Sequence, residues 1–515
     1  MEEEAGLRYT VENEEQFWTE LDEIVGAPSE DHEQIDNMLR SYLQYTTNNF
    51  KKEYLQSEYD IARCCYKLLD APVFKENQEY VRRQILYCLL QEDDADTLHL
   101  AAAVLLFDGR YSESTFEMMQ TERAFPRLVE LIRAKRDDDA GLHRLLLELL
   151  FEMSRIQRLT RDDILSVDDS FILYLFQLIE ELSDDAEDPY HYPVIRVLLV
   201  LNEQYMVLAN APASPGEDNR PVTNRILKLL SMHGPSYRTF GENIILLLNR
   251  ETELGRQLMI LKLFYLLFTT PATYEYFYTN DLHVLVDVII RNLLDLDPGS
   301  ADMGLSPDGM ERDGQRALRH TYLRVLCPLL KNTQLAREGN NYKREEVRKL
   351  LYLLVNRSSA HFAPVDETVL RLVLRCKQIE WLREEGDEDD HELEEKLNEK
   401  LQACAPTESE VAKKLLGMSI AEASVSTLSV QDVSAKIVKE KPSVPLPRRM
   451  RKMSKPGVNG GTNGDDQLLK VPPKPPPPKA RRKANNLPKI DAASQGAEIS
   501  RDDTRSPFAD ENAET

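Results

Sequence analysis

The sequence predicts an all-α fold, an armadillo/HEAT-like α-solenoid followed by a disordered, proline-rich basic tail. Three observations carry this prediction. From about residue 30 to residue 383, apolar residues recur at i, i+3 and i+4 in one segment after another. Most of these segments have two apolar stripes, and none shows the alternation of a strand. Proline or glycine marks the short connections, as at Pro126, Pro189 and Pro271.

The individual segments show how the helices are expected to pack. In SEYDIARCCYKLLDA, Ile61, Cys65 and Leu68 share one helix face, and ENQEYVRRQILYCLLQE places Val81 and Ile85 in the same way. The same spacing continues in later segments, among them GLHRLLLELLFEM, FILYLFQLIEEL, GENIILLLNRE, GRQLMILKLFYLLF and KREEVRKLLYLLV. These helices are too many for one bundle core, and no strict repeat motif recurs. We therefore expect stacked helical hairpins with degenerate units.

Composition divides the chain into four parts. An acidic N-terminal segment (1–29) precedes an armadillo-like leucine-rich domain (30–383). The segment 384–404 is acidic and compatible with a helix, and the tail 405–515 has too few large apolar residues to fold. Inside the domain, the stretches 209–221 and 297–315 are rich in Gly, Pro and Asp, as long loops are. Thr239 and Glu242 have the spacing of a helix capping box.

Charge and composition limit the partners and the compartment. The net charge is −24, but residues 436–490 hold 15 basic and 3 acidic residues, which gives +12 there and −36 elsewhere. An acidic body disfavours nucleic acid and anionic membranes, and the basic tail restores either only locally. No apolar run reaches the ~18 residues of a membrane span, and the acidic N-terminus is unlike a signal peptide. Six scattered cysteines predict reduced thiols in a cytoplasmic protein.

Motifs of catalysis and of metal binding are missing from the sequence. It contains no HExxH, no GxSxG, no Gly-Lys-Ser/Thr loop and no CxxC pair. FDGRY (107–111) resembles the magnesium motif of kinases, but the companion kinase signatures are absent. A solvated loop explains the acidic cluster at 136–139 better than paired catalytic carboxylates do. We therefore expect a protein that is not an enzyme, with no catalytic residue, metal or cofactor.

The tail contains two motifs that predict binding to SH3 domains. In each motif, a lysine stands three residues before a PxxP pair. The six residues are Lys439, Pro442, Pro445, Lys470, Pro473 and Pro476. Because proline fixes φ, such a segment is pre-formed as a polyproline II helix, and the cation meets an acidic specificity pocket. The alternatives are a solubilising linker or, for RRMRK and KARRK, a nuclear-import signal or a patch for anionic lipid.

A block of polar residues interrupts an otherwise apolar helix in VIRVLLVLNEQYMV (194–207). Apolar stripes flank it on both sides, so the helix is expected to be buried on most of its surface. An unpaired buried amide costs about 1–3 kcal/mol, so we expect Asn202 to be a structural tie to a neighbouring helix. Contact with a partner protein is the alternative. Arg196 and Glu203 are seven residues apart and are expected to form an exposed pair.

The central helices resemble the leucine-rich domain of an actin-regulatory family. The resemblance lies in DPYHYPVIRVLLVLNEQYMV, NRILKLLSMHGPSYRTFGENIILLLNRE, LKLFYLLFTTPATYEYFYTNDLHVLVDVIIRNLLDL, LRHTYLRVLCPLLKNTQL and HFAPVDETVLRLV. The family includes the fungal Las-seventeen-binding protein of cortical actin patches and the animal NCK-interacting protein with SH3 domain. The similarity covers residues 30–383 and is densest from 188 to 375.

The resemblance implies a cytoplasmic regulator of cortical actin assembly in endocytosis. Family members bind the actin-related protein 2/3 complex and activate it without a mother filament, which yields linear filaments. The proline-rich tail is similar to that of members recruited by SH3 proteins of the endocytic coat, whereas no segment of this sequence resembles the N-terminal SH3 domain of the animal protein. The alternative is a passive scaffold that links SH3-containing coat proteins without promoting nucleation.

Overall fold

The computed structural model describes residues 13–28, 31–136, 139–182, 191–210, 222–296, 309–337, 339–355 and 367–383. Every regular element in these ranges is helical, which confirms the all-α fold class. The acidic segment 384–404, the whole tail and its six predicted SH3-binding residues lie outside the described residues.

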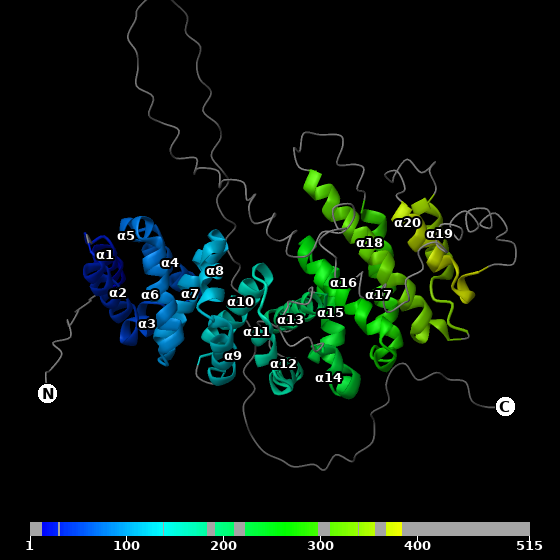
Figure 1. The fold of residues 1–515 in the computed structure, drawn as a ribbon, viewed down its shortest axis with the longest axis horizontal. Coiled ribbons are helices and arrows are strands. Elements are labelled where there is room, and N and C mark those ends of the chain that lie inside the picture. Colours follow the sequence, from blue (N-terminus) through cyan, green and yellow to red (C-terminus); the bar gives the residue numbers. More distant parts are fainter. Residues whose placement is uncertain are drawn as a thin grey trace, which may run out of the picture. The chain divides into compact units, whose positions relative to one another are not determined.

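The helices follow one another closely along the chain (Figure 1). In the first half they are α1 Glu14–Val25, α2 His32–Thr46, α3 Asn48–Tyr54, α4 Glu58–Asp70, α5 Pro72–Glu76, α6 Gln78–Gln91, α7 Ala95–Tyr111, α8 Glu113–Thr121, α9 Ala124–Ala134, α10 Ala140–Ile156, α11 Arg161–Ser166 and α12 Asp169–Glu181. In the second half they are α13 Tyr192–Asn210, α14 Arg225–His233, α15 Arg238–Arg250, α16 Leu254–Thr269, α17 Thr279–Asp295, α18 Gly309–Asn332, α19 Arg344–Val355 and α20 Glu367–Lys377. Short 3-10 turns follow four of them, at Gly234–Ser236, Pro271–Thr273, Gln334–Ala336 and Glu380–Leu382.

Contacts between helices define two rows, as expected for an α-solenoid. In the first row, each helix packs on the next in the order α4, α7, α10, α13, α16, α18, α20. In the second row, α12, α15, α17 and α19 pack in the same successive way, and each also packs on a helix of the first row. Up to α16, every third helix joins the first row, which is the armadillo pattern, and from there every second helix does, which is the HEAT pattern. The predicted fold is confirmed.

Two predicted boundaries differ from the structure. Helix α1 falls in the predicted N-terminal segment 1–29, yet it packs on α2 and α4. Its Phe17 ring stacks on those of Tyr45 and Tyr54 at 5.1 and 4.9 Å, so the array extends at least to α1. Residues 309–315 fall in a predicted loop, but α18 begins at Gly309. The Gly and Asp content of 309–315 is typical of a loop, but these residues form the first part of α18.

The predicted capping box at Thr239 is wrong. Thr239 lies inside the first turn of α15, and its backbone N–H donates to Glu180 Oε1 of α12 at 2.9 Å. The Thr239 hydroxyl donates to the other oxygen of the same carboxylate at 2.5 Å. A side chain from a neighbouring helix therefore satisfies the start of α15 in place of a local cap. True capping boxes occur at Ser57 with Asp60 and at Thr160 with Asp163.

Packing explains FDGRY, the segment that resembles a kinase motif. Asp108 is buried and accepts two hydrogen bonds from the Arg82 guanidinium of α6, at 2.6 and 3.0 Å. A Cβ atom built on Gly109 would lie 2.3 Å from the ring of Phe116 in α8, so only glycine allows this approach of α7 and α8. The presence of Asp108 and Gly109 is therefore explained by hydrogen bonding and packing, which the resemblance to a kinase motif did not reveal.

Candidate functional site

The polar block of α13 is buried. Asn202, Glu203 and Gln204 are 0, 3 and 2% exposed. The Asn202 Oδ1 accepts a hydrogen bond from Asn224 Nδ2 at 2.7 Å, and Asn224 is itself the N-cap that receives the Leu227 N–H of α14. Asn202 therefore has the burial and the bonding that a tie between helices requires. That Asn202 acts as a structural tie stays a prediction.

Gln204 binds the C-terminal end of α10. Its Nε2 donates to the carbonyl oxygens of Ser154 and Gln157, at 2.5 and 2.9 Å, and its Oε1 accepts the Leu159 N–H at 3.1 Å. The last carbonyls of a helix have no partner within it. One side-chain amide of α13 thus satisfies the end of α10 and the first residues beyond it.

The predicted exposed pair of Arg196 and Glu203 is not formed. Glu203 is buried and accepts two hydrogen bonds from Lys262 Nζ of α16, at 2.8 and 3.0 Å. Only 4 and 9% of the two side chains are exposed. The prediction failed because Glu203 faces α16. There Lys262, which interrupts an apolar run, neutralises the charge of Glu203. Arg196 is half-buried, and burial, followed by the nearby Arg256, lowers its pKa.

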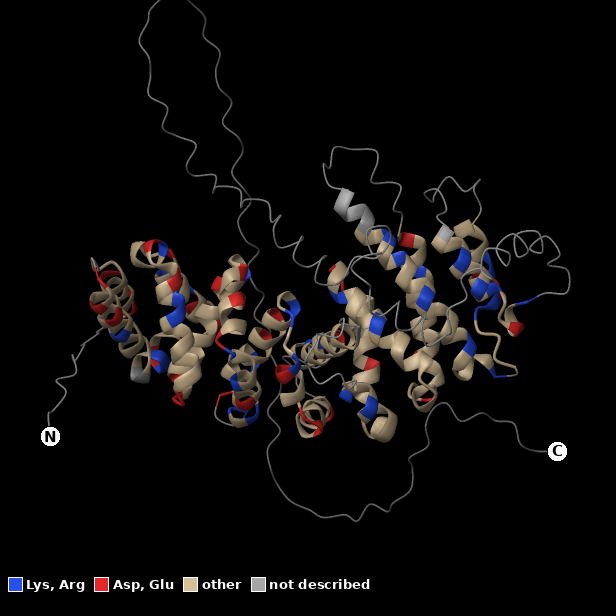
Figure 2. Cartoon of the chain, in the orientation of Figure 1, with Lys and Arg blue, Asp and Glu red and all other residues tan. Residues whose placement is uncertain are grey.

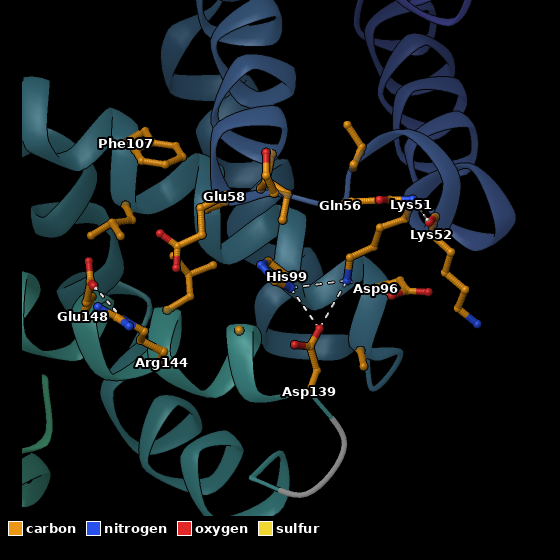
Figure 3. Close-up of a pocket in the computed structure, with 18 of the residues that line it drawn as sticks. Lys51, Lys52, Gln56, Glu58, Asp96, His99, Phe107, Asp139, Arg144 and Glu148 are labelled. Carbon is orange, nitrogen blue, oxygen red and sulfur yellow. Dashed lines mark hydrogen bonds and ion pairs between the residues drawn. The ribbon is translucent and has the colours of Figure 1, made fainter. Parts of the chain in front are cut away.

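A cavity of about 790 Å³ lies between the α3–α4 connection, α7 and α10. In Figure 3, the side chains of Lys51, His99 and Asp139 point toward one another in this cavity. Lys51 Nζ lies 2.7 Å from Asp96 Oδ1 and 3.3 Å from Asp139 Oδ2. His99 Nδ1 lies 3.0 Å from Asp139 Oδ2, so one carboxylate joins α3, α7 and α10.

The electrostatics of the cavity keep His99 neutral and Asp139 ionised. Burial lowers the pKa of His99, although the Asp139 carboxylate opposes this effect. Burial would raise the pKa of Asp139, but the Leu142 N–H, His99 and Lys51 outweigh it and hold the pKa at about 2. The neutral imidazole then donates from Nδ1 to Asp139, which leaves Lys51 to bond the two aspartates. These bonds hold three helices together and give each charged group of the cluster a partner.

The residues of this cavity were missed in the sequence. Asp139 belongs to the acidic cluster at 136–139, which was expected to be a solvated loop, yet it caps α10 and accepts the Leu142 N–H at 3.0 Å. Its place directly before GLHRLLLELL is an N-cap signal that could have been recognised. Lys51 lies 88 residues away, and nothing in the sequence links the two residues.

Residues 187–347 match the family model described as SPIN90/Ldb17, leucine-rich domain. This central stretch of the chain is similar to the SPIN90/Ldb17 leucine-rich domain. The matched range begins just before α13 and contains Asn202, Glu203 and Lys262, so the buried polar block lies within the part of the chain that is similar to this domain. The cavity around Lys51 lies outside the matched range.

Three relatives are similar to this chain over a longer range than the family model. Protein dip1 of Schizosaccharomyces pombe is 29% identical over 381 residues, which is 73% of this chain and 96% of that protein. Protein LDB17 of Saccharomyces cerevisiae is 27% identical over 425 residues, or 71% of this chain and 80% of that one. Protein LDB17 of Eremothecium gossypii is 27% identical over 405 residues, or 70 and 80%. A solved engineered protein has a TM-score of 0.31 at 14% identity over 69% of this chain and 77% of its own, too distant to bear on the fold.

In the described parts of the chain, no helix is long and apolar enough to cross a membrane. Across the same residues, no three His, Cys, Asp or Glu side chains are grouped so that they could hold a metal ion. The name of the matched family specifies a leucine-rich domain and no enzymatic activity.

We predict that Glu203 and Lys262 depend on each other. Glu203→Leu or Lys262→Leu alone should lower the free energy of unfolding by about 3–5 kcal/mol, because each leaves one buried charge unpaired. The double variant should lose clearly less than the sum of the two. Urea unfolding followed by circular dichroism measures these values. The matched control is Glu79→Leu in the exposed pair with Arg83, which should cost about 0.5 kcal/mol or less. Additive losses at Glu203 and Lys262 would contradict the coupling.

We also predict that His99 makes stability depend on pH. Its pKa is lower in the folded state than the ordinary 6.5, so the unfolded chain binds more protons below that value. Stability should therefore be complete above about pH 6.5 and fall as the pH drops toward 5. Asp139, with a pKa of about 2, does not titrate in this window. The variant His99→Gln should show a flatter dependence of melting temperature on pH, and equal slopes in both proteins would exclude His99 as the cause.

Proposed function

We propose that this chain is a non-enzymatic regulator of cortical actin assembly in endocytosis. In this proposal, its helical rows bind and activate the actin-related protein 2/3 complex, and the product is a linear seed filament. The observation that carries the proposal is the match of residues 187–347 to the SPIN90/Ldb17 leucine-rich domain, with similarity to dip1 along 96% of that relative. The tail serves recruitment by SH3 proteins through Lys439, Pro442, Pro445, Lys470, Pro473 and Pro476.

The physical basis of activation is differential affinity. A partner that alternates between two states shifts toward the state that the binding surface favours. A shift from 1:99 to 99:1 requires about 5.5 kcal/mol of difference in binding free energy. A binding surface can supply that difference only if it keeps its own conformation when the partner binds. The bonds of Asn202, Glu203 and Gln204 to α14, α16 and α10 support such stiffness.

The proposed division of labour follows the predicted parts of the chain. The leucine-rich domain, 30–383 with α1 added, acts on the complex. The acidic segment 384–404 leads to the tail 405–515, which recruits SH3 proteins and places the chain in cytoplasmic cortical actin patches. No bond chemistry is needed at any step, so the proposal requires no cofactor or metal.

The activity is tested by assembly of pyrene-labelled actin with purified actin-related protein 2/3 complex and the full chain, without seed filaments. The lag should shorten severalfold as the chain rises through micromolar concentrations, and microscopy of early time points should show unbranched filaments. The matched control is the complex alone at the same actin concentration. An unchanged lag together with direct binding to the complex would favour the passive scaffold instead.

A further inference from the structure

Arg196 of α13 is a half-buried cation without an acidic partner. The glutamate expected to pair with it, Glu203, is bound by Lys262 instead. In the part of the chain that the structure describes, no carboxylate oxygen lies within 4.0 Å of the Arg196 guanidinium, and no hydrogen bond reaches it. Its Nε is buried without a hydrogen bond, so the terminal nitrogens are the part of the side chain that is left to meet a partner from outside.

The charged side chains around Arg196 lie on α7, α10, α13 and α16, which are consecutive helices of the first row, and directly before α16. We call them the arginine cluster. Its arginines are Arg110, Arg144, Arg155, Arg196 and Arg256, and its glutamates are Glu148, Glu152, Glu251 and Glu253. The cluster therefore has five cations and four carboxylates, and one positive charge is in excess.

Ion pairs within the cluster place this excess charge on Arg196. Each glutamate is bound by an arginine other than Arg196. The pairs and their N–O distances are Arg110–Glu148 at 2.9 Å, Arg155–Glu152 at 2.7 Å, Arg256–Glu251 at 2.7 Å and Arg256–Glu253 at 2.8 Å. Arg144 lies 3.8 Å from Glu148. Arg196 is thus the member of the cluster that is left without a carboxylate.

This arrangement is unfavourable for the free protein. Burial, followed by the nearby Arg256, lowers the pKa of Arg196, so the folded chain disfavours the charged form. An uncharged side chain of similar size would suit the same place better. A group that lowers stability and reaches the surface is typical of a functional site, where stability and activity make opposite demands.

The charge of the arginine cluster selects its occupant. One carboxylate neutralises one excess cation, and the terminal nitrogens of a guanidinium can donate two parallel hydrogen bonds to it. A phosphate group carries about −1.5 to −2 charges, which would leave negative charge beside four glutamates. In Figure 2, acidic residues gather on α1 and α2 and basic residues on α18 and α19. The cluster lies on helices between these two groups, so its own excess charge decides what it attracts.

The cavity of about 790 Å³ adjoins the arginine cluster. Arg144 and Glu148 line it on the side opposite Lys51 (Figure 3). Phe107 and Leu145 belong to its apolar lining. An apolar side chain next to an acidic one can therefore enter the cavity while the acidic one binds the cluster. Apolar anchors beside an arginine are a common composition of the residues that dominate binding energy in protein interfaces.

We propose that Arg196 binds an aspartate or glutamate side chain of the actin-related protein 2/3 complex, and that the adjoining cavity receives a neighbouring apolar side chain. This inference rests on the proposed function, to which it adds a point of contact on the folded domain. Docking covers the guanidinium and supplies the missing carboxylate. The ion pair becomes stronger as water leaves the interface.

Affinity of the full chain for the purified complex, measured by biolayer interferometry, tests the proposal. Arg196→Met keeps the length of the side chain but removes the charge, and should weaken binding at least about tenfold, because the acidic side chain of the complex is left buried and unpaired. Arg196→Lys keeps the charge without the two-nitrogen fork and should lose less. The matched control is Arg83→Met on α6, where Arg83 is bound to Glu79 at 2.9 Å. It should leave the affinity unchanged.

The melting temperature of the same variants separates docking from a structural role. Because Arg196 is unpaired in the free protein, Arg196→Met should raise the melting temperature by about 1–3 °C. Arg83→Met removes an exposed ion pair and should change it by less than about 1 °C. A lower melting temperature of Arg196→Met would show that Arg196 stabilises the fold, and would overturn the proposal.

The remaining outcomes distinguish the inference from the proposed function. A wild-type chain that does not bind the complex would refute the proposed function itself. Binding by the wild type with equal affinity in Arg196→Met would leave the proposed function standing and overturn the role of Arg196. Sodium phosphate that raises the melting temperature of the wild type but not of Arg196→Met, without such an effect of sodium acetate at equal ionic strength, would assign the site to phosphate and overturn the choice of a carboxylate.

Discussion

Helices α13, α16 and α18 of the first row are each enclosed by the helix before them in the row, the helix after them and a member of the second row. This constraint governs the rest of the structure, because a polar group on such a helix has almost no access to water and must find a partner in the protein. Asn202, Glu203 and Gln204 meet it by reaching three different helices from three consecutive positions. Arg82 and Asp108 meet it between α6 and α7.

The same constraint connects stability with the proposed activity. A buried charge pair contributes little net stability, but breaking it is costly, so the arrangement that satisfies it is strongly preferred over alternatives. A row of helices joined by such pairs resists sliding of one helix along the next. A binding surface needs this resistance to helix sliding if binding is to change the conformation of the partner more than that of the surface itself.

The sequence was sufficient for properties that depend on local pattern. Helix type and the stacking of helices follow from apolar spacing, and the burial of Asn202 follows from the stripes on both sides of it. Properties that depend on distant residues were not accessible: Glu203 pairs with a lysine 59 positions away, and Asp139 with a lysine 88 positions away. Thr239 shows the opposite error. The sequence has the spacing of a local capping box there, but the Glu180 carboxylate of α12 binds the start of α15 instead.

The bond from Gln204 to the end of α10 shows that the range matched by the family model differs from the unit that folds. The family match begins at residue 187 and ends at residue 347, near the start of α19. Cutting the chain there would strip α13 of its α10 neighbour and leave the Gln204 amide and the apolar face around it in water. The boundary recognised by similarity therefore runs through a shared core. A fragment that behaves well in solution should start upstream of α10 and continue beyond α20.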